Sequence, residues 1–290
     1  MNFEIVTDSS CNLTNALIKE LGLHIMSLTY RFGDEVYKTF EEDKETDMKS
    51  FYARLRNGET ATTSLATYES FEKVAIPLLE SGKDILYIGF SSGLSGTYQV
   101  TSLACNDLKE KYPDRKIIAV DTLAASLGEG LLVYKAAKLR LEGKTIDECA
   151  EFLENTKFHL CHWFTVNDLF FLKKGGRVSG STALIGTLLN IKPVMHMDNE
   201  GHLIVKGKVR GRKASLDALV AKAGELGEDL SSQTVFISHG DCIEDAEYVR
   251  DQMIKKYGVK EKILINYVDC VIGAHSGPGT VALFFVGKER

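Results

Sequence analysis

The sequence predicts an α/β protein built from two domains. Three times in the first half, a short apolar run ends in a polar pair, namely Asp8-Ser9, Ser91-Ser92 or Asp121-Thr122, and a helical pattern follows. This order is typical of strand–helix–strand units in a parallel sheet that binds ligands at the carboxyl ends of its strands. The second half contains a predicted hairpin and then alternating strands and helices, which indicates a separate α+β domain with a mixed or antiparallel sheet. The chain of 290 residues is long enough for two domains.

We place the domain boundary at residue 158, which gives an N-terminal domain 1–158 and a C-terminal domain 159–290. In the first, the predicted strands are 3–7, 24–32, 85–90 and 116–120, and the predicted helices are 12–21, 48–56, 69–81, 95–111, 127–142 and 145–155. Residues 33–49 are acidic and weakly patterned, so we expect a surface hairpin and loop there. Thr67 is positioned to cap the helix that follows it, and Thr145 with Glu148 has the spacing of a capping box.

The C-terminal domain shows shorter, more varied segments. Its predicted strands are 160–166, 191–197, 202–210, 234–238, 262–268 and 280–286, and its predicted helices are 168–174, 182–189, 213–226 and 243–257. The stretch Asp198-Asn199-Glu200-Gly201 is a turn signal between two strands, which predicts a hairpin.

Composition excludes several classes of protein. The net charge of −5 and the pI of 5.9 argue against non-specific nucleic-acid binding. The first residues lack the pattern of a signal peptide, and no run of about eighteen apolar residues is present. We therefore expect a cytoplasmic protein whose six scattered cysteines are reduced. Neither a dinucleotide motif, a P-loop nor a metal-ligand spacing occurs, so we expect no cofactor and no metal.

Our functional hypothesis rests mainly on the segment 85–99. Its apolar run enters a small, hydroxyl-rich loop that contains Gly93, Ser95 and Gly96, and a helix is predicted to begin there. Glycines allow close approach of backbone, and a helix start offers free N–H groups at the positive end of the helix dipole. The loop is therefore suited to an anion such as a phosphate or a carboxylate. A second hydroxyl cluster spans 60–67, and His275 lies in a glycine-rich loop that we assign to the same site.

A serine hydrolase is the alternative reading of the same segment. Gly89, Ser91 and Gly93 match the G-x-S-x-G nucleophile elbow. Asp241 or Asp269 and then His275 follow later in the chain, in the order of a Ser, Asp, His triad. Against this reading, no His-Gly-Gly-type oxyanion segment lies upstream, and glycines continue where a hydrolase helix begins at once. A module that binds a small anion without a lipid is the third alternative.

A basic segment stands out in the otherwise acidic chain. Residues 173–213 contain nine Lys or Arg and two acidic residues. The segment is either a solvated hairpin whose edge lysines oppose aggregation or a docking face for an acidic partner or a phosphorylated ligand.

Six blocks of sequence together resemble the DegV family over essentially the whole chain. They are Val6-Thr7-Asp8-Ser9-Ser10, Thr62-Thr63-Ser64, Ser91-Ser92-Gly93-Leu94-Ser95-Gly96-Thr97-Tyr98-Gln99, Val120-Asp121-Thr122, Lys174-Gly175-Gly176-Arg177-Val178 and Gly273-Ala274-His275-Ser276-Gly277-Pro278-Gly279-Thr280. The resemblance implies a bacterial, cytoplasmic, two-domain protein of the EDD fold. It implies one long-chain fatty acid, of the palmitate, stearate or oleate type, in a tunnel between the domains. It also implies a non-catalytic role, in which the protein presents that fatty acid to a separate fatty acid kinase subunit that makes acyl phosphate.

The resemblance also assigns roles to single residues. It implies that the fatty-acid carboxylate is bound by Thr63, Ser92, Ser95, Gly96 and His275, and that Arg177 and Arg210 face the kinase partner. Where the family usually has Thr-Ser-Gln-Pro, this chain has Thr63-Ser64-Leu65-Ala66, so the wall of the site differs there. Candidates for the tunnel wall, each equally suited to an ordinary core, are Leu169, Phe170, Phe171, Leu184, Ile185, Leu188 and Leu189.

Overall fold

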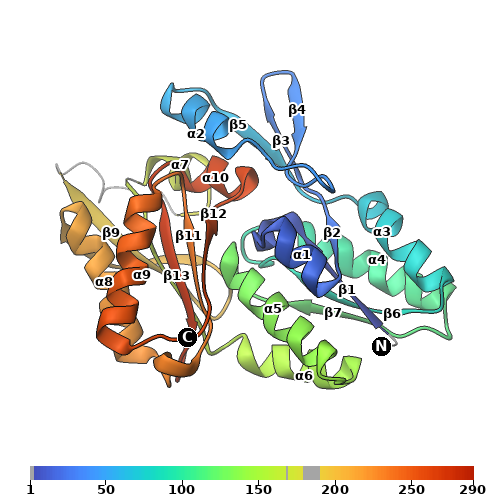
Figure 1. Cartoon of the computed structure of the whole chain (residues 1–290). Coiled ribbons are helices and arrows are strands. Elements are labelled where there is room, and N and C mark those ends of the chain that lie inside the picture. Colours follow the sequence, from blue (N-terminus) through green and yellow to red (C-terminus); the bar gives the residue numbers. More distant parts are fainter. Residues whose placement is uncertain (1–2, 168, 179–189) are drawn as a thin grey trace.

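Two sheets with their helices make up most of the molecule (Figure 1). The structure is a computed structural model that describes residues 3–167, 169–178 and 190–290. It confirms the predicted α/β fold class, with a parallel first sheet and a mixed second sheet. The predicted helix 182–189 lies outside the described residues.

The first sheet has the strand order β2-β1-β6-β7, and all its strands are parallel. Its strands are β1 (Phe3–Asp8), β2 (Leu23–Met26), β6 (Asp84–Gly89) and β7 (Ile117–Asp121), and its helices are α1 (Asn15–Leu21), α3 (Tyr68–Glu80), α4 (Thr97–Lys111), α5 (Leu127–Leu141) and α6 (Ile146–Thr156). Alternate residues of β6 enter different cores: Leu86 and Ile88 pack with α5 and α6, whereas Ile85 and Tyr87 pack with α3 and α4. Both faces of the sheet are therefore covered, as parallel sheets require.

The second sheet has the order β10-β9-β8-β13-β11-β12. Its strands are β8 (Leu160–Thr165), β9 (Ile191–Met197), β10 (Leu203–Arg210), β11 (Val235–His239), β12 (Ile263–Tyr267) and β13 (Val281–Val286), and its helices are α7 (Phe170–Lys174), α8 (Arg212–Leu226), α9 (Ile243–Tyr257) and α10 (Cys270–Ser276). Only β11 and β12 pair in parallel among the described strands of this sheet. The predicted hairpin is confirmed as β9 and β10, and α8 and α9 cover one face of the sheet.

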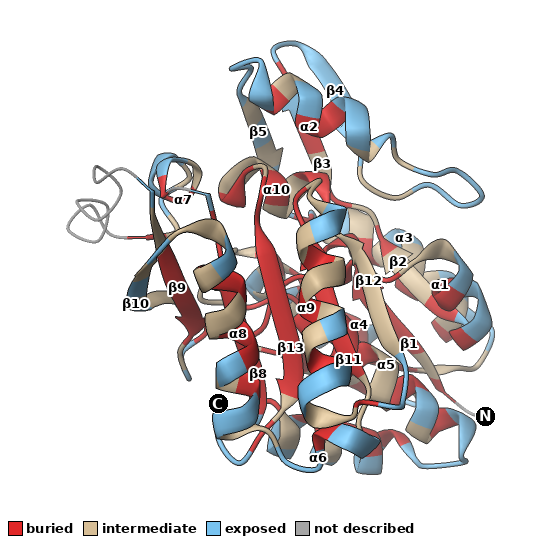
Figure 2. Cartoon of the chain, turned by 60° about the vertical axis from the view of Figure 1, so that its left-hand side comes forward, coloured by how far each residue is buried: buried red, intermediate tan, exposed pale blue. Residues whose placement is uncertain are grey.

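Helix α5 lies between the two sheets and joins their cores. A Cβ on Gly128 would come within 2.8 Å of the Phe284 ring, so a glycine is needed for this close packing. Farther along α5, the rings of Tyr134 and Phe236 meet edge to face with centroids 5.6 Å apart. Buried residues of both sheets therefore belong to one hydrophobic cluster, which Figure 2 shows as largely red strands flanked by helices with exposed outer faces.

A small third sheet forms an arm above the two domains (Figure 1). Its strands are β3 (Thr29–Phe32), β4 (Glu35–Lys38) and β5 (Ala61–Ser64), and helix α2 (Met48–Arg56) packs on it. The prediction of one strand over 24–32 was wrong, because the chain leaves the first sheet after Met26 and enters the arm at Thr29. Between them the amide of Leu28 donates to the Ser9 hydroxyl, a tertiary contact that periodicity does not reveal.

Two segments that we read as loops are regular structure. The hydroxyl cluster 60–67 contains strand β5, which pairs antiparallel with β3 and places Thr63 opposite Tyr30. The glycine-rich segment around His275 contains helix α10, and the carboxylate of Asp269 caps it by accepting from the amide of Ile272 at 2.8 Å. Gly273 sits within that helix because a Cβ there would come within 2.6 Å of the Tyr52 hydroxyl.

The turn of the β9–β10 hairpin packs on the loop that follows β6. The Ser91 hydroxyl donates to the carbonyl of Gly201 at 2.9 Å. A Cβ on Gly93 would come within 2.6 Å of the carbonyl oxygen of Glu200. The close approach that Gly93 permits is therefore to this turn, and the contact fixes the loop of one domain against the hairpin of the other.

Two global findings complete the fold. Among the described helices, none combines the length and the apolar character needed to cross a membrane. The six cysteines are free thiols, and all but Cys242 are buried.

Candidate functional site

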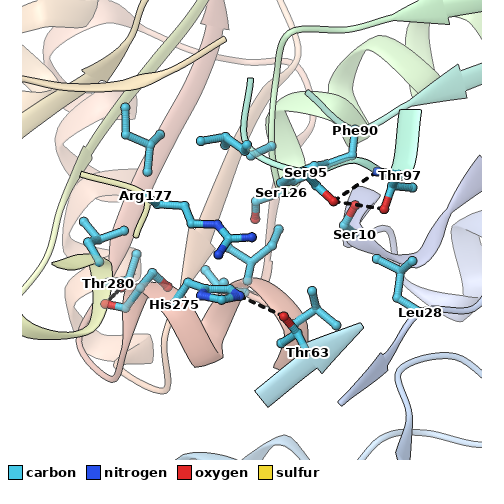
Figure 3. A pocket seen from close by; sticks show the side chains of 18 of the residues that line it. Ser10, Leu28, Thr63, Phe90, Ser95, Thr97, Ser126, Arg177, His275 and Thr280 are labelled. Carbon is cyan, nitrogen blue, oxygen red and sulfur yellow. Dashed lines mark hydrogen bonds between the residues drawn. The ribbon is translucent and has the colours of Figure 1, made fainter. Parts of the chain in front are cut away.

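A cavity of about 200 Å³ lies where the two domains and the arm meet (Figure 3). The polar groups that line it are Ser10, Thr63, Ser64, Ser95, Thr97, Ser126, His162, Arg177, His275, Ser276 and Thr280. The remaining lining residues are Leu28, Leu65, Phe90, Leu94, Gly96, Ala125, Phe164, Leu172, Leu203, Val268, Val271, Ile272 and Ala282. The wall is mostly apolar, which suits a ligand with a small polar group and a long hydrocarbon part.

Thr63 and His275 form the contact that closes one side of the cavity. The Thr63 hydroxyl and Nε2 of His275 lie 2.9 Å apart, although one residue belongs to β5 and the other to α10. Burial lowers the pKa of His275 to about 4, and the positive charge of Arg177 acts in the same direction. The imidazole is therefore neutral near pH 7, and its Nδ1 is buried without a partner among the described residues.

Arg177 also reaches this side of the cavity. Figure 3 shows its guanidinium group beside the His275 ring. Gly175 allows this arrangement, because a Cβ there would come within 2.3 Å of Nδ1 of His275. Burial lowers the pKa of Arg177 from its ordinary value, but a guanidinium stays charged at neutral pH. The site thus contains one permanent positive charge.

The start of helix α4 supplies the opposite wall. The Ser95 hydroxyl lies 3.0 Å from that of Thr97 and accepts from the amide of Thr97 at 3.2 Å. Gly96 is the N-cap residue and has no side chain to cap the helix, so the Ser95 hydroxyl takes the amide of Thr97 instead. The expected juxtaposition of Ser95, Gly96 and a helix start is present at the cavity, as Figure 3 shows for the hydroxyls. The N-terminus of the helix adds a partial positive charge there.

The structure places the other predicted residues elsewhere. Ser92 does not line the cavity; its amide donates to Asp121 at 3.3 Å and its carbonyl accepts from Gln99. Arg210 is exposed at the end of β10 and does not line the cavity. We had grouped Arg177 with Arg210 on a partner-facing surface, whereas the cavity contains only the first of the two.

The hydrolase arrangement is not formed in the described part of the chain. Ser91 is fully buried, and its hydroxyl donates to the Gly201 carbonyl. The ring of His275 instead contacts Thr63. Its triad partner is also missing, because Asp269 caps α10 and Asp241 pairs with Arg56. A nucleophile needs a base within hydrogen-bond reach, and Ser91 has none.

The predicted tail-contacting residues need a correction. Leu169, Phe170 and Phe171 do not line the cavity: Leu169 is buried in the core and Phe170 is 60% exposed. Leu172, one turn beyond Leu169 on α7, faces the cavity instead. Leu184, Ile185, Leu188 and Leu189 lie outside the described residues.

Buried carboxyl groups support the wall near Ser10. The Ser10 hydroxyl donates to Asp8 and, at 3.2 Å, to Glu129. Burial raises the pKa of Glu129 well above its ordinary value, and it also raises the pKa of Asp8. Protonated carboxyls lose less solvation energy when buried, so this network is compatible with a dry interior. Across the described ranges, no group of three or more His, Cys, Asp and Glu side chains is arranged to hold a metal ion.

Sequence reasoning missed several lining groups. The resemblance assigns no role to Ser10, and Ser126 and Thr280 lie where the sequence predicts only the starts of helix 127–142 and strand 280–286. His162 lies in the middle of a strand whose residues are all buried, so its pattern gave no functional signal. In chemical terms, the site offers hydroxyl and guanidinium donors to an anion and apolar surface to a hydrocarbon chain.

Comparisons with known proteins agree with this description. Residues 2–288 match the family described as "Uncharacterised protein, DegV family". A DegV domain-containing protein of Clostridium perfringens is 43% identical over 288 residues, which cover 99% of this chain and 98% of the relative. A solved structure of a fatty acid-binding DegV family protein from Thermus thermophilus is 29% identical, with a TM-score of 0.88 over 99% of this chain and all of that one.

A second solved structure is that of a Thermotoga maritima protein that "reveals fatty acid binding function". It is 28% identical and has a TM-score of 0.85 over 99% of each chain. Because the family match and the relative each extend over nearly the whole length, this chain belongs to the DegV family.

Proposed function

We propose that this protein binds one long-chain fatty acid in the cavity between its domains. The carboxylate lies at the Thr63–His275 pair, where Ser95 and Arg177 donate hydrogen bonds, and the tail follows the apolar wall. The observation that carries this proposal is that Thr63, Ser95 and His275, together with the charged Arg177, line one cavity whose wall is otherwise mostly apolar. The similar proteins that are described as binding fatty acids support it.

The energetics favour a fatty acid over a small anion. Arg177 neutralises the carboxylate charge, and charge-assisted hydrogen bonds are roughly twice as strong as neutral ones. Each buried CH₂ adds about 0.8 kcal/mol, so a long tail contributes most of the binding free energy. A small anion would not contact the apolar wall and would gain none of this hydrophobic free energy.

We further propose that the protein performs no chemistry itself and presents the carboxylate to a separate fatty acid kinase subunit. Exposed Lys206, Lys208 and Arg210 alternate along β10, an edge strand, and form a basic row. Such a row suits the acidic surface of a kinase subunit, which would supply the nucleotide. The cavity residues bind and orient the acid, and the resulting acyl phosphate forms only when that subunit is added.

Native mass spectrometry of the purified protein tests the binding proposal. We expect one long-chain fatty acid per chain, identified after extraction, and full reloading of delipidated protein with palmitic, stearic or oleic acid. An unliganded mass that does not change after incubation with these acids would contradict fatty-acid binding and favour the small-anion module.

Reconstitution tests the kinase proposal. The loaded protein, ATP and a bacterial fatty acid kinase subunit should give acyl phosphate, whereas the loaded protein with ATP alone should give none. Product in the absence of the kinase subunit would overturn the non-catalytic assignment.

A further inference from the structure

One histidine in the cavity wall has no place in the carboxylate site. His162 lies on β8 directly opposite Phe284 of β13, whereas Phe164 lies opposite Ala282. Thr280, next to the carboxylate site, immediately precedes β13. The path from Thr280 to the level of Phe284 covers about 14 Å along an antiparallel strand. His162 is therefore far down the cavity from the predicted head group.

Two phenylalanine rings contact this imidazole, and Arg290 and His196 lie near enough to act on it electrostatically. Its ring stacks on Phe284 with centroids 4.6 Å apart and on Phe164 with centroids 5.7 Å apart. The residue is only 4% exposed, and burial holds its pKa well below the ordinary value. The ring is therefore neutral, with one donor and one acceptor nitrogen.

This hydrogen-bonding capacity is not used within the described protein. Nδ1 is enclosed and has no partner among the described residues, and because His162 lines the cavity we infer that the edge with Nε2 faces it. Buried polar groups are almost always paired, and an unpaired one is unfavourable. A hydrocarbon chain passing Phe164 and Ala282 cannot pair with an imidazole, whereas a chain that carries an oxygen at that depth can.

We propose that His162 selects acyl chains that bear a hydroxyl group in their distal part. The inference rests on the proposed fatty-acid binding and narrows its ligand class to hydroxylated long-chain acids. The hydroxyl can donate to or accept from the imidazole, so it fits either neutral tautomer. The rings of Phe164, on the same strand, and Phe284, on the paired strand, hold the imidazole in place and leave the ligand as its hydrogen-bond partner.

The test compares octadecanoic acid with a positional series of hydroxyoctadecanoic acids, each competing for delipidated protein in native mass spectrometry. We expect the wild-type protein to prefer one distal position, or two adjacent ones, about tenfold over octadecanoic acid, since a hydrogen bond satisfies a buried group there. The His162→Phe variant keeps an aromatic ring for stacking and should lose this preference. The His162→Gln variant keeps a donor and an acceptor and should retain part of it.

Two failures have different meanings in this experiment. If the wild-type protein binds none of the acids, the fatty-acid proposal itself fails. If it binds octadecanoic acid at least as tightly as every hydroxylated isomer, fatty-acid binding stands and the role of His162 is overturned. An equal preference in the wild type and the His162→Phe variant would likewise overturn it. Circular dichroism and octadecanoic acid binding show whether each variant is folded.

Discussion

The Thr63 hydroxyl lies 2.9 Å from Nε2 of His275, although 212 positions separate them in the chain. The arm carries Thr63 on β5, and the C-terminal domain carries His275 on α10. The contact is formed only when these two parts are in place, so the head-group site depends on tertiary structure and on no local motif.

Removing both hydroxyls should release the ligand. In the Thr63→Ala/Ser95→Ala variant, two hydrogen bonds to a charged group are lost, at roughly 1.5–3 kcal/mol each, so we expect fatty-acid affinity to fall at least about 100-fold. Native mass spectrometry and binding titration measure this. Thr63→Ser keeps the hydroxyl and should bind normally, as should Ser92→Ala, whose hydroxyl is outside the cavity lining. Undiminished lipid content in the double variant would refute the carboxylate assignment.

Substitutions of Arg177 and Arg210 should have different effects, one on fatty-acid binding and the other on acyl phosphate formation with the kinase subunit. Arg177→Met removes the positive charge in the cavity and should weaken fatty-acid binding about 30- to 100-fold, because hydrogen bonds to charged groups are strong. Arg210→Met changes only the exposed end of β10 and should leave binding unchanged while slowing acyl phosphate formation with the kinase subunit. Fatty-acid affinity and the rate of acyl phosphate formation are measured for both variants. Weaker fatty-acid binding by Arg210→Met would contradict the assignment of Arg210 to partner contact alone.

Ligand binding should change the titration of His275. Without ligand, burial and the Arg177 charge lower its pKa to about 4. A carboxylate placed beside the ring favours the imidazolium, so the pKa should rise by at least about one unit in the complex. Histidine NMR resonances followed against pH with and without fatty acid report this change, and a His275→Gln sample assigns the signal. The same pKa in both states would place the carboxylate away from His275.

The cap of helix α10 should make stability depend on pH. Burial raises the pKa of Asp269 to about 7 from 3.8, so the folded protein holds this proton more tightly than the unfolded chain. The stabilisation is complete below pH 3.8 and is lost as the pH rises through about 7. Asp269→Asn keeps an oxygen for the amide of Ile272 and removes the titration.

Urea unfolding at pH 5 and pH 8 checks this behaviour. Relative to the wild type, the Asp269→Asn variant should gain on the order of 2–4 kcal/mol in unfolding free energy between the two pH values. The comparison cancels the titration of groups that do not interact with Asp269, and it therefore reports Asp269 together with its buried neighbours Asp8 and Glu129. A constant difference between the proteins would show that this carboxyl is already ionised at pH 5.

The hairpin contact should not tolerate a methyl group. In Gly93→Ala, the added Cβ would lie 2.6 Å from the carbonyl oxygen of Glu200, so backbone has to move, which destabilises the protein by about 1–3 kcal/mol. Gly96→Ala is the matched control, because its Cβ meets only a leucine methyl at 3.5 Å. Urea midpoints rank the two variants, and equal midpoints would mean that the turn is not held against the loop.

Local patterns predicted most elements well and missed those that depend on distant contacts. Helices α2 and α9 begin and end at the predicted residues, because amphipathic periodicity and end signals define them. The break between β2 and β3 has no such signal, since apolar residues continue through it. Helix α10 was missed because it has only seven residues and a glycine-rich turn follows it, and packing against Tyr52 explains the glycine within it, Gly273.

In the site, too, local sequence predicted some residues, whereas those that depend on distant contacts were missed. The resemblance brought Thr63, Ser95 and His275 to attention, and all three line one cavity. Their roles there stay predictions. The cavity position of Arg177 could not be inferred, because the turn after α7 and its packing against His275 determine where the side chain points. His162 was equally hidden, since a buried histidine within a strand resembles any core residue.

The cavity between the domains also affects how preparations of this protein compare. A ligand that fills it binds the folded chain and not the unfolded one, so occupancy raises the melting temperature by mass action. Batches grown on different lipid supplies would then differ in heat resistance with no change in sequence. The melting temperature of a preparation would then report how much ligand the growth medium supplied. The stabilities of two variants should therefore be compared only after delipidation.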